Sequence, residues 1–204
     1  MGISIIICSK NKIALSKAKQ NIADTIGCDF EIIHEDNSLN PISLSSMYNR
    51  LFPKANYDNI VFLHEDIEFV STNWGHKIYS LLENQQIGLV GLSGSTYKSI
   101  YPGVWSASLQ STYRFSNSEN GFEKNIKNTL FYNVSVIDGC FIAGKKNIFE
   151  EHYFDERLIG FHGYDIDLSF RVVKKYNLVV AKAIDFIHFS NGHQNTDWII
   201  SSLY

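Results

Sequence analysis

The stretch Ile60-Val61-Phe62-Leu63-His64-Glu65-Asp66-Ile67 decides the fold, because a short apolar run ends abruptly in groups that can bind a metal or a proton. Such a run, bounded by polar residues, is typical of a strand buried on both faces. In an open parallel sheet, ligands bind beyond the carboxyl ends of the strands. On an extended backbone His64 and Asp66 project to one side and Glu65 to the other. The stretch alone does not distinguish a metal and nucleotide site from an ordinary polar strand end.

The residues on either side of this stretch predict strands that alternate with helices. We expect strands over residues 3–8, 30–33, 60–63 and 87–92. Apolar residues spaced three and four apart predict helices near residues 15–26, 44–53 and 74–81, and Gly27 is well placed to end the first. This alternation predicts right-handed crossovers and an α/β, Rossmann-like fold with a mostly parallel sheet flanked by helices.

The second half of the chain is less regular. Residues 93–130 show no sustained period and hold several aromatic residues, so we expect a functional or mobile loop there. Its aromatic side chains would either stack on a sugar ring or pack the loop down. We expect a strand over residues 131–137 that continues through 141–143, a short helix over 145–151 and a strand over 178–184. Ile166, Phe170 and Val173 predict the apolar face of a further helix.

Length, charge and cysteine content limit the possible functions. A chain of 204 residues, 45% of them hydrophobic, is expected to form one domain over residues 1–204. The net charge of -3, with scattered Lys and Arg, predicts no affinity for nucleic acid. The three cysteines are far apart and include no C-x-x-C pair, which favours a reducing compartment. No run approaches the roughly 20 apolar residues of a membrane span, so we expect a soluble, cytoplasmic protein without a transmembrane segment.

Polar residues that follow the predicted strands are candidates for a binding site. Asp36 could accept hydrogen bonds from a base or ribose, and Asp66 could hold a cation against a diphosphate. His188 could complete the metal shell, since neutral imidazole and carboxylate suit Mn²⁺ or a similar ion. A histidine at a strand end is, however, more often hydrogen-bonded within the protein than a ligand. Both interpretations stay open on these residues alone.

Two carboxylates near the last helix also have two interpretations. Asp165 precedes an apolar-periodic run, so it could be a catalytic group or only the N-cap of that helix. Asp167 and Arg171 are four residues apart, as in a helical ion pair. The sequence contains no G-x-x-x-x-G-K-[ST], G-x-G-x-x-G, H-E-x-x-H or G-x-S-x-G motif. With no glycine-rich cradle, phosphates would have to be held by a metal.

Seven short segments match, in order, the pattern of one known family. They are residues 4–11, 31–38, 47–49, 61–67, 137–139, 161–168 and 187–190. Together they resemble a family 2-type glycosyltransferase with the A-type nucleotide-sugar-binding fold. The resemblance is strongest to the bacterial branch in which the metal motif reads His-x-Asp. Each segment is weak alone, but the ordered set covers nearly the whole chain.

The resemblance assigns most of the candidate residues. It implies nucleotide contacts for Ser9, Asn11, Asp36, Asn49 and His64, of which His64 replaces the first Asp of the usual motif. It implies that Asp66 and His188 bind a divalent metal, Mn²⁺ or Mg²⁺.

Asp165 matches the general base, whereas Tyr164 replaces the Glu of the family's Glu-Asp pair. The acceptor would meet Trp105, Gly139 and Tyr164. By the same resemblance, residues 1–92 form the nucleotide-binding half and 93–204 the acceptor and catalytic half.

The implied activity is that of a metal-dependent, inverting glycosyltransferase. It would move a sugar from a nucleotide sugar, expected to be a UDP-sugar, to a hydroxyl of a glycan or lipid-linked glycan. The setting would be bacterial surface-glycan synthesis, in the cytoplasm or at the inner face of the membrane, with self-association of the chain left open. One alternative is an inactive member that binds only a sugar nucleotide or a partner. The other is a nucleotidyltransferase, for which Ser9-Lys10-Asn11-Lys12 is short and lacks glycine.

Overall fold

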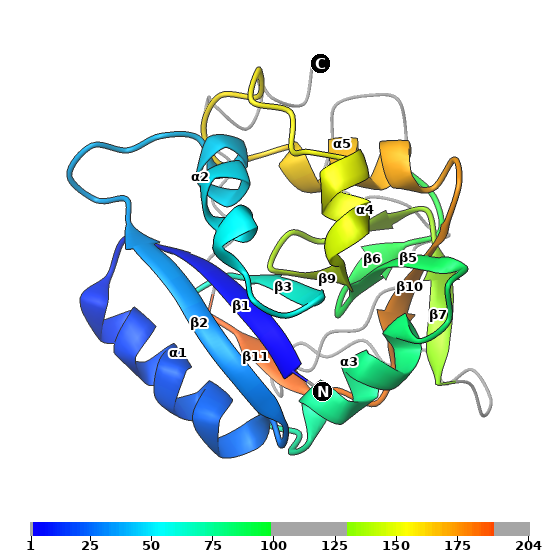
Figure 1. Ribbon diagram of the computed structural model, residues 1–204, viewed down its shortest axis with the longest axis horizontal. Coiled ribbons are helices and arrows are strands. Elements are labelled where there is room, and N and C mark those ends of the chain that lie inside the picture. The colour runs from blue at the N-terminus through cyan, green and yellow to red at the C-terminus, as the bar shows by residue number, and fades with distance from the viewer. Residues whose placement is uncertain (1, 99–129, 190–204) are drawn as a thin grey trace.

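The computed structural model describes residues 2–98 and 130–189, which are built around a seven-stranded sheet (Figure 1). In sheet order the strands are β2 (Asp29–Asp36), β1 (Gly2–Ser9), β3 (Asn59–Leu63), β9 (Phe141–Lys145), β5 (Ile87–Gly91), β10 (Asn177–Ala181) and β7 (Phe131–Val134). β2, β1, β3, β5 and β10 share one direction, whereas β9 and β7 run the opposite way. The predicted α/β, mostly parallel fold is confirmed.

Helices cover both faces of this sheet. One face carries α1 (Lys12–Thr25) and α3 (Trp74–Leu82). The other carries α2 (Leu44–Leu51), which runs into a 3-10 turn (Phe52–Lys54), together with α4 (Lys146–Glu151) and α5 (Tyr164–Val172). In β1, Ile5 and Ile7 pack toward α1, whereas Ile6 packs toward α2. Because alternate side chains of a strand face opposite ways, a strand covered on both faces is apolar along most of its length.

The ends of the first helix follow directly from the sequence. The side chain of Asn11 accepts hydrogen bonds from the backbone nitrogens of Ile13 and Ala14, and so caps the start of α1. Gly27 follows the last turn with a φ of 76°, a conformation that favours glycine, so its predicted role in ending the helix is confirmed. At 14 residues α1 is the longest described helix, and none of the described helices could span a bilayer.

The region after residue 130 differs from the prediction. The expected strand over 131–137 divides into β7 and β8 (Val136–Ile137), and β8 pairs with β6 (Gly94–Ser95). Residues 141–143 do not continue that strand; they belong to β9, which lies between β3 and β5. The chain turns at Asp138, whose carboxylate accepts a hydrogen bond from the backbone nitrogen of Cys140 at 2.8 Å. The hydrophobic pattern did not reveal this turn, because the residues of the turn and those of the strands on either side have a similar composition.

A second, two-stranded sheet joins distant parts of the chain. β4 (Ile67–Phe69) pairs antiparallel with β11 (Phe186–His188), and Ile67 lies opposite His188. The backbone nitrogen of Phe189 donates to the carbonyl oxygen of Asp66 at 3.0 Å. The sheet therefore fixes the segment that follows β3 against the last described residues of the chain.

The buried face of α5 also differs from the prediction, which placed Ile166, Phe170 and Val173 on it. Leu168 and Val172 are fully buried instead, whereas the exposed fractions of Phe170 and Val173 are 44% and 38%. Apolar residues three and four positions apart can be found along more than one face of this helix. The position at which the helix starts determines which of these faces is buried. α5 starts at Tyr164, which is also buried, so the stripe that faces the sheet runs through positions four apart.

This corrected face gives a first prediction. Leu168→Ala should lower the free energy of unfolding by about 2–5 kcal/mol, because it leaves a cavity in the core. Phe170→Ala should cost less than about 1 kcal/mol, because much of that ring is already in contact with water. Urea unfolding of both variants measures the difference. Equal costs, or a larger cost for Phe170→Ala, would contradict the assigned face.

Candidate active site

The loop between β1 and α1 is held in place by Glu65. One carboxylate oxygen of Glu65 accepts a hydrogen bond from the Ser9 hydroxyl at 2.6 Å. The other accepts from the backbone nitrogens of Lys10 and Asn11, at 3.0 and 3.1 Å. Glu65 therefore binds the loop whereas His64 and Asp66 approach each other, but Glu65 and Asp66 form a turn rather than the expected extended backbone, and the structural role of Glu65 was missed. Only tertiary contact reveals that this carboxylate faces the loop nitrogens.

Three of the five residues predicted to contact the nucleotide lie together where β1 and β2 end. Ser9 and Asp36 are register partners at the carboxyl ends of β1 and β2, and Asn11 follows β1 directly. Ser9 is buried, whereas Asp36 is exposed and accepts hydrogen bonds from the backbone nitrogen and hydroxyl of Ser38. These hydrogen bonds hold the pKa of Asp36 below its ordinary value. Nucleotide binding by these residues stays a prediction.

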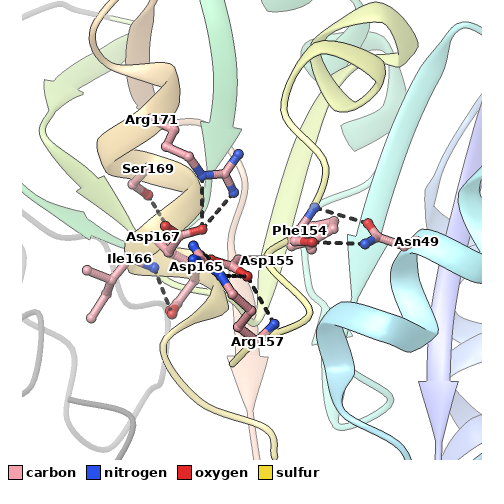
Figure 2. Close-up of polar contacts among 9 residues, drawn as sticks. All are labelled: Asn49, Phe154, Asp155, Arg157, Asp165, Ile166, Asp167, Ser169 and Arg171. Atoms are coloured by element: carbon pink, nitrogen blue, oxygen red, sulfur yellow. Dashed lines mark hydrogen bonds and ion pairs between the residues drawn. The ribbon is translucent and has the colours of Figure 1, made fainter. Parts of the chain in front are cut away.

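Asn49, the fourth of these residues, makes its hydrogen bonds with a different segment. Its amide donates to the carbonyl oxygen of Phe154 at 2.9 Å and accepts from the backbone nitrogen of the same residue at 3.0 Å (Figure 2). It also donates to Glu156, which accepts a further hydrogen bond from Ser46. The geometry therefore favours a structural role for Asn49, as the anchor of the segment that leads toward α5.

His64, Asp66 and His188 form a compact group of possible metal ligands. One candidate donor atom from each lies within 4.8 Å of the others. Nε2 of His188 is 3.4 Å from Oδ1 of Asp66, and Nδ1 of His64 is 4.0 Å from the same oxygen. Among the described residues the buried Nε2 of His188 finds no partner with hydrogen-bond geometry. A buried imidazole nitrogen without a hydrogen-bond partner, beside a carboxylate, fits a divalent metal, because the neutral ring can offer that nitrogen as a ligand.

The charges around this group also suit a cation. Burial works against the charge of Asp66, but His188 and His64 hold its pKa below the ordinary value. Burial, and after it the neighbouring His188, lowers the pKa of His64, so its imidazole is neutral. Burial opposes a proton on His188, yet Asp66 and Asp138 outweigh it and raise that pKa. The carboxylates that attract a proton to His188 would equally attract a metal ion.

Gly139 connects this group to Asp165. The hydroxyl of Tyr164 donates to the carbonyl oxygen of Gly139 at 3.0 Å and lies 2.8 Å from Nε2 of His64. The backbone nitrogen of Gly139 donates to Oδ2 of Asp165 at 2.9 Å. A Cβ atom at position 139 would lie 2.1 Å from the Tyr164 hydroxyl oxygen, so only glycine fits between these groups.

Asp165 is not the N-cap of α5, which was one of its two interpretations. The N-cap position belongs to Gly163, which has a left-handed backbone and no capping side chain. Asp165 lies in the first turn, and Oδ1 accepts from the backbone nitrogen of Ile166 at 2.9 Å (Figure 2). Burial, with a further contribution from Asp138, raises the pKa of Asp165 to about 7. A carboxylate with that pKa is suited to accept a proton near neutral pH.

Asp167, by contrast, is engaged on the helix surface. Its Oδ2 binds Nε and Nη2 of Arg171, at 3.0 and 2.6 Å, so the predicted helical ion pair is confirmed (Figure 2). Arg157 makes a similar pair with Asp155 in the segment that precedes α5. The two carboxylates of α5 therefore have separate surroundings, and only Asp165 faces Gly139.

The residues predicted to meet the acceptor have different placements. Trp105 lies outside the described residues. Tyr164 and Gly139 are buried, and their polar groups bind each other, His64 and Asp165. Acceptor contact through these two residues stays a prediction, but the geometry favours a positioning role for both.

A pocket of about 280 Å³ adjoins the metal group on the side of α1. It is lined by residues of α1 and by the segment from Glu65 to Glu68, together with Asn11 and Phe189. Its lining includes Asp66 but neither Asp36 nor Asp165. The pocket therefore does not by itself connect the predicted donor residues with the candidate base.

The raised pKa of Asp165 gives a second prediction. A carboxyl whose pKa is higher in the folded state stabilises the fold at low pH, and this stability is lost as the pH rises from about 4 to about 7. Asn does not titrate. The unfolding free energy of Asp165→Asn relative to the parent should therefore rise by at least about 1 kcal/mol between about pH 5 and about pH 8.

Urea unfolding without divalent ions measures this difference, and Asp167→Asn is the matched control from the same helix turn. If the two variants follow the parent's pH dependence equally, Asp165 does not have the raised pKa.

Comparison with known proteins identifies the family. A family model described as "Glycosyltransferase like family" matches residues 4–203. No curated protein matches the chain. Among solved structures, the chain is similar to that titled "Crystal Structure of A197 from STIV", with 16% identity and a TM-score of 0.54. That match covers 94% of this chain and 87% of the other, and it supports the shared α/β fold. Because the family match spans nearly the whole sequence, the chain belongs to the glycosyltransferase-like family and is a glycosyltransferase.

Proposed function

We propose that the protein is a metal-dependent, inverting glycosyltransferase that uses a nucleotide-sugar donor, a UDP-sugar by resemblance. The observation that carries the proposal is the position of Asp165. This carboxylate has a pKa of about 7 and is connected through Gly139 and Tyr164 to His64, within the group of possible metal ligands. An inverting transfer requires a base for the acceptor hydroxyl and positive charge near the departing diphosphate.

Donor binding is assigned to the edge where β1, β2 and β3 end. Ser9, Asn11 and Asp36 would bind the nucleoside there, and Asp66 and His188 would hold the divalent ion. A divalent ion bound there would stabilise the negative charge that develops on the leaving diphosphate. On this assignment residues 1–92 serve the donor, and residues 93–204 serve the acceptor and catalysis, with His188 contributing to the donor side.

Asp165 would remove the proton from the acceptor hydroxyl as the sugar is transferred with inversion. Its two backbone hydrogen bonds fix the carboxylate, and burial, with a further contribution from Asp138, keeps its pKa high enough for proton transfer. We propose a hydroxyl of a glycan or lipid-linked glycan as the acceptor, in bacterial surface-glycan synthesis, on the basis of the family resemblance. The metal ion on the donor side and the Asp165 base on the acceptor side would then lie on either side of one transfer site.

The metal assignment gives a third prediction. Asp66→Asn should abolish Mn²⁺-dependent binding of UDP, because Asn cannot supply the charge that compensates the cation. The midpoint of thermal unfolding should remain close to the parent's, because the Asp66 side chain is 37% exposed. Isothermal titration with UDP, with and without Mn²⁺, measures the effect. If the variant binds UDP and Mn²⁺ as the parent does, Asp66 is not the metal ligand.

The base gives a fourth prediction, which also separates an enzyme from a protein that only binds donor. Asp165→Asn should reduce sugar transfer by roughly 10²-fold or more, with little change in donor affinity. Asp167→Asn is the control: it breaks the Arg171 ion pair, should cost less than about 1 kcal/mol of stability and should retain transfer.

A panel of nucleotide sugars, assayed for transfer and hydrolysis, supplies the substrate for this test. Transfer that survives in Asp165→Asn but is lost in Asp167→Asn would move the base two residues along the helix. Donor binding by the parent without any turnover on the panel would favour the inactive, binding-only alternative.

A further inference from the structure

We propose that His64 is a third metal ligand through Nδ1, and that Tyr164 is the positioning residue that fixes the required imidazole tautomer. This inference rests on the proposed metal-dependent function and deepens it. The sequence placed His64 with the nucleotide and Tyr164 with the acceptor. In the structure the two side chains bind each other, at 2.8 Å between Nε2 and the hydroxyl oxygen.

The tautomer follows from the hydrogen-bonding capacity of three groups. The carbonyl oxygen of Gly139 can only accept, and the Tyr164 hydroxyl reaches it at 3.0 Å. Gly139 is buried, so its carbonyl requires that donor. The single hydroxyl proton of Tyr164 is thereby used, and its oxygen is left to accept from His64. Nε2 of a neutral His64 therefore carries the ring proton, and Nδ1 carries a lone pair.

The other tautomer would leave two groups unsatisfied. If Nδ1 carried the proton, Oδ1 of Asp66 would lie 4.0 Å from it, too far for a hydrogen bond. Nε2 would then take the Tyr164 proton, and the buried carbonyl of Gly139 would lose its donor. The observed geometry satisfies all three groups only when the lone pair of Nδ1 faces Asp66 and His188.

The lone pair completes a defined donor set. Nδ1 of His64, a carboxylate oxygen of Asp66 and a ring nitrogen of His188 would meet one ion, since these groups lie within 4.8 Å of one another. Imidazole ligands favour first-row transition metals over Mg²⁺, which prefers oxygen ligands. We therefore expect Mn²⁺ to bind more tightly than Mg²⁺. The Tyr164–His64 hydrogen bond is the kind of outer contact that orients a metal-binding imidazole.

The metal-free protein provides a test that needs neither metal nor substrate. NMR spectra of full-length protein with ¹⁵N-labelled histidine should show Nε2 of His64 protonated and Nδ1 bare. The signals that disappear in His64→Gln assign this ring among the seven histidines. In the Tyr164→Phe variant, both neutral tautomers of His64 should be populated. A parent protein whose His64 carries its proton on Nδ1 would overturn the inference.

Metal titration separates a ligand from a structural histidine. The amide nitrogen of Gln occupies the position of Nε2, so His64→Gln can keep the hydrogen bond to Tyr164 while it loses the Nδ1 ligand. Tyr164→Phe should weaken Mn²⁺ binding by about 10-fold or more, and His64→Gln should weaken it further. Tyr176→Phe, which removes a hydroxyl that contacts Glu151 instead, is the control and should bind like the parent.

The outcomes of the titration distinguish a failure of this inference from a failure of the proposed function. If His64→Gln binds Mn²⁺ as the parent does, His64 is not a ligand, although Asp66, His188 and the proposed transfer reaction would stand. If Tyr164→Phe binds like the parent, Tyr164 does not set the ligand geometry. Mg²⁺ binding as tight as Mn²⁺ binding would overturn the donor set. Failure of the parent to bind Mn²⁺ would overturn both the ligand role of His64 and the proposed metal dependence.

Discussion

The antiparallel pairing of β9 with β3 is the constraint on which the rest of the site depends. Leu63, the last residue of β3, lies opposite Phe141, the first residue of β9. The turn before β9 is therefore held at the carboxyl edge, where the backbone nitrogen of His64 donates to the carbonyl oxygen of Cys140. In a wholly parallel sheet, the residues before a strand would lie at the opposite edge. One reversed strand thus brings Gly139 to the edge where the other strands present their ligands.

The turn after β3 contributes side chains to two parts of the site, because successive side chains of the turn point in different directions. Glu65 accepts hydrogen bonds from the β1–α1 loop, whereas His64 and Asp66 face His188. The pairing of β4 with β11 then holds His188 opposite Ile67. Loop position and ligand position are consequently set by the same few residues, so a shift of this turn would disturb the predicted nucleotide contacts and the metal group together.

The sequence predicted the layers of the fold and part of the site, for physical reasons that also explain its failures. Continuous apolar runs such as that around Val61 are diagnostic of buried parallel strands, and metal-binding residue types at strand ends are visible directly. The antiparallel β9 was missed because its hydrophobic pattern equals that of a parallel strand. The hydrogen bonds of Glu65 and Asn49 could not be predicted, because they reach residues 54 and 105 positions away. No local pattern records which backbone groups such side chains will meet.

Asp165 shows how the separate contacts combine into one chemical property. Its burial alone disfavours a charged carboxylate, and Asp138 adds repulsion, whereas the backbone nitrogens of Gly139 and Ile166 oppose both effects. The net result is a pKa of about 7, higher than that of an ordinary carboxyl but still compatible with ionisation at neutral pH. Weaker hydrogen bonding would leave the group protonated, and greater exposure would make it a poorer base. The turn at Gly139 therefore sets both where the carboxylate lies and how readily it accepts a proton.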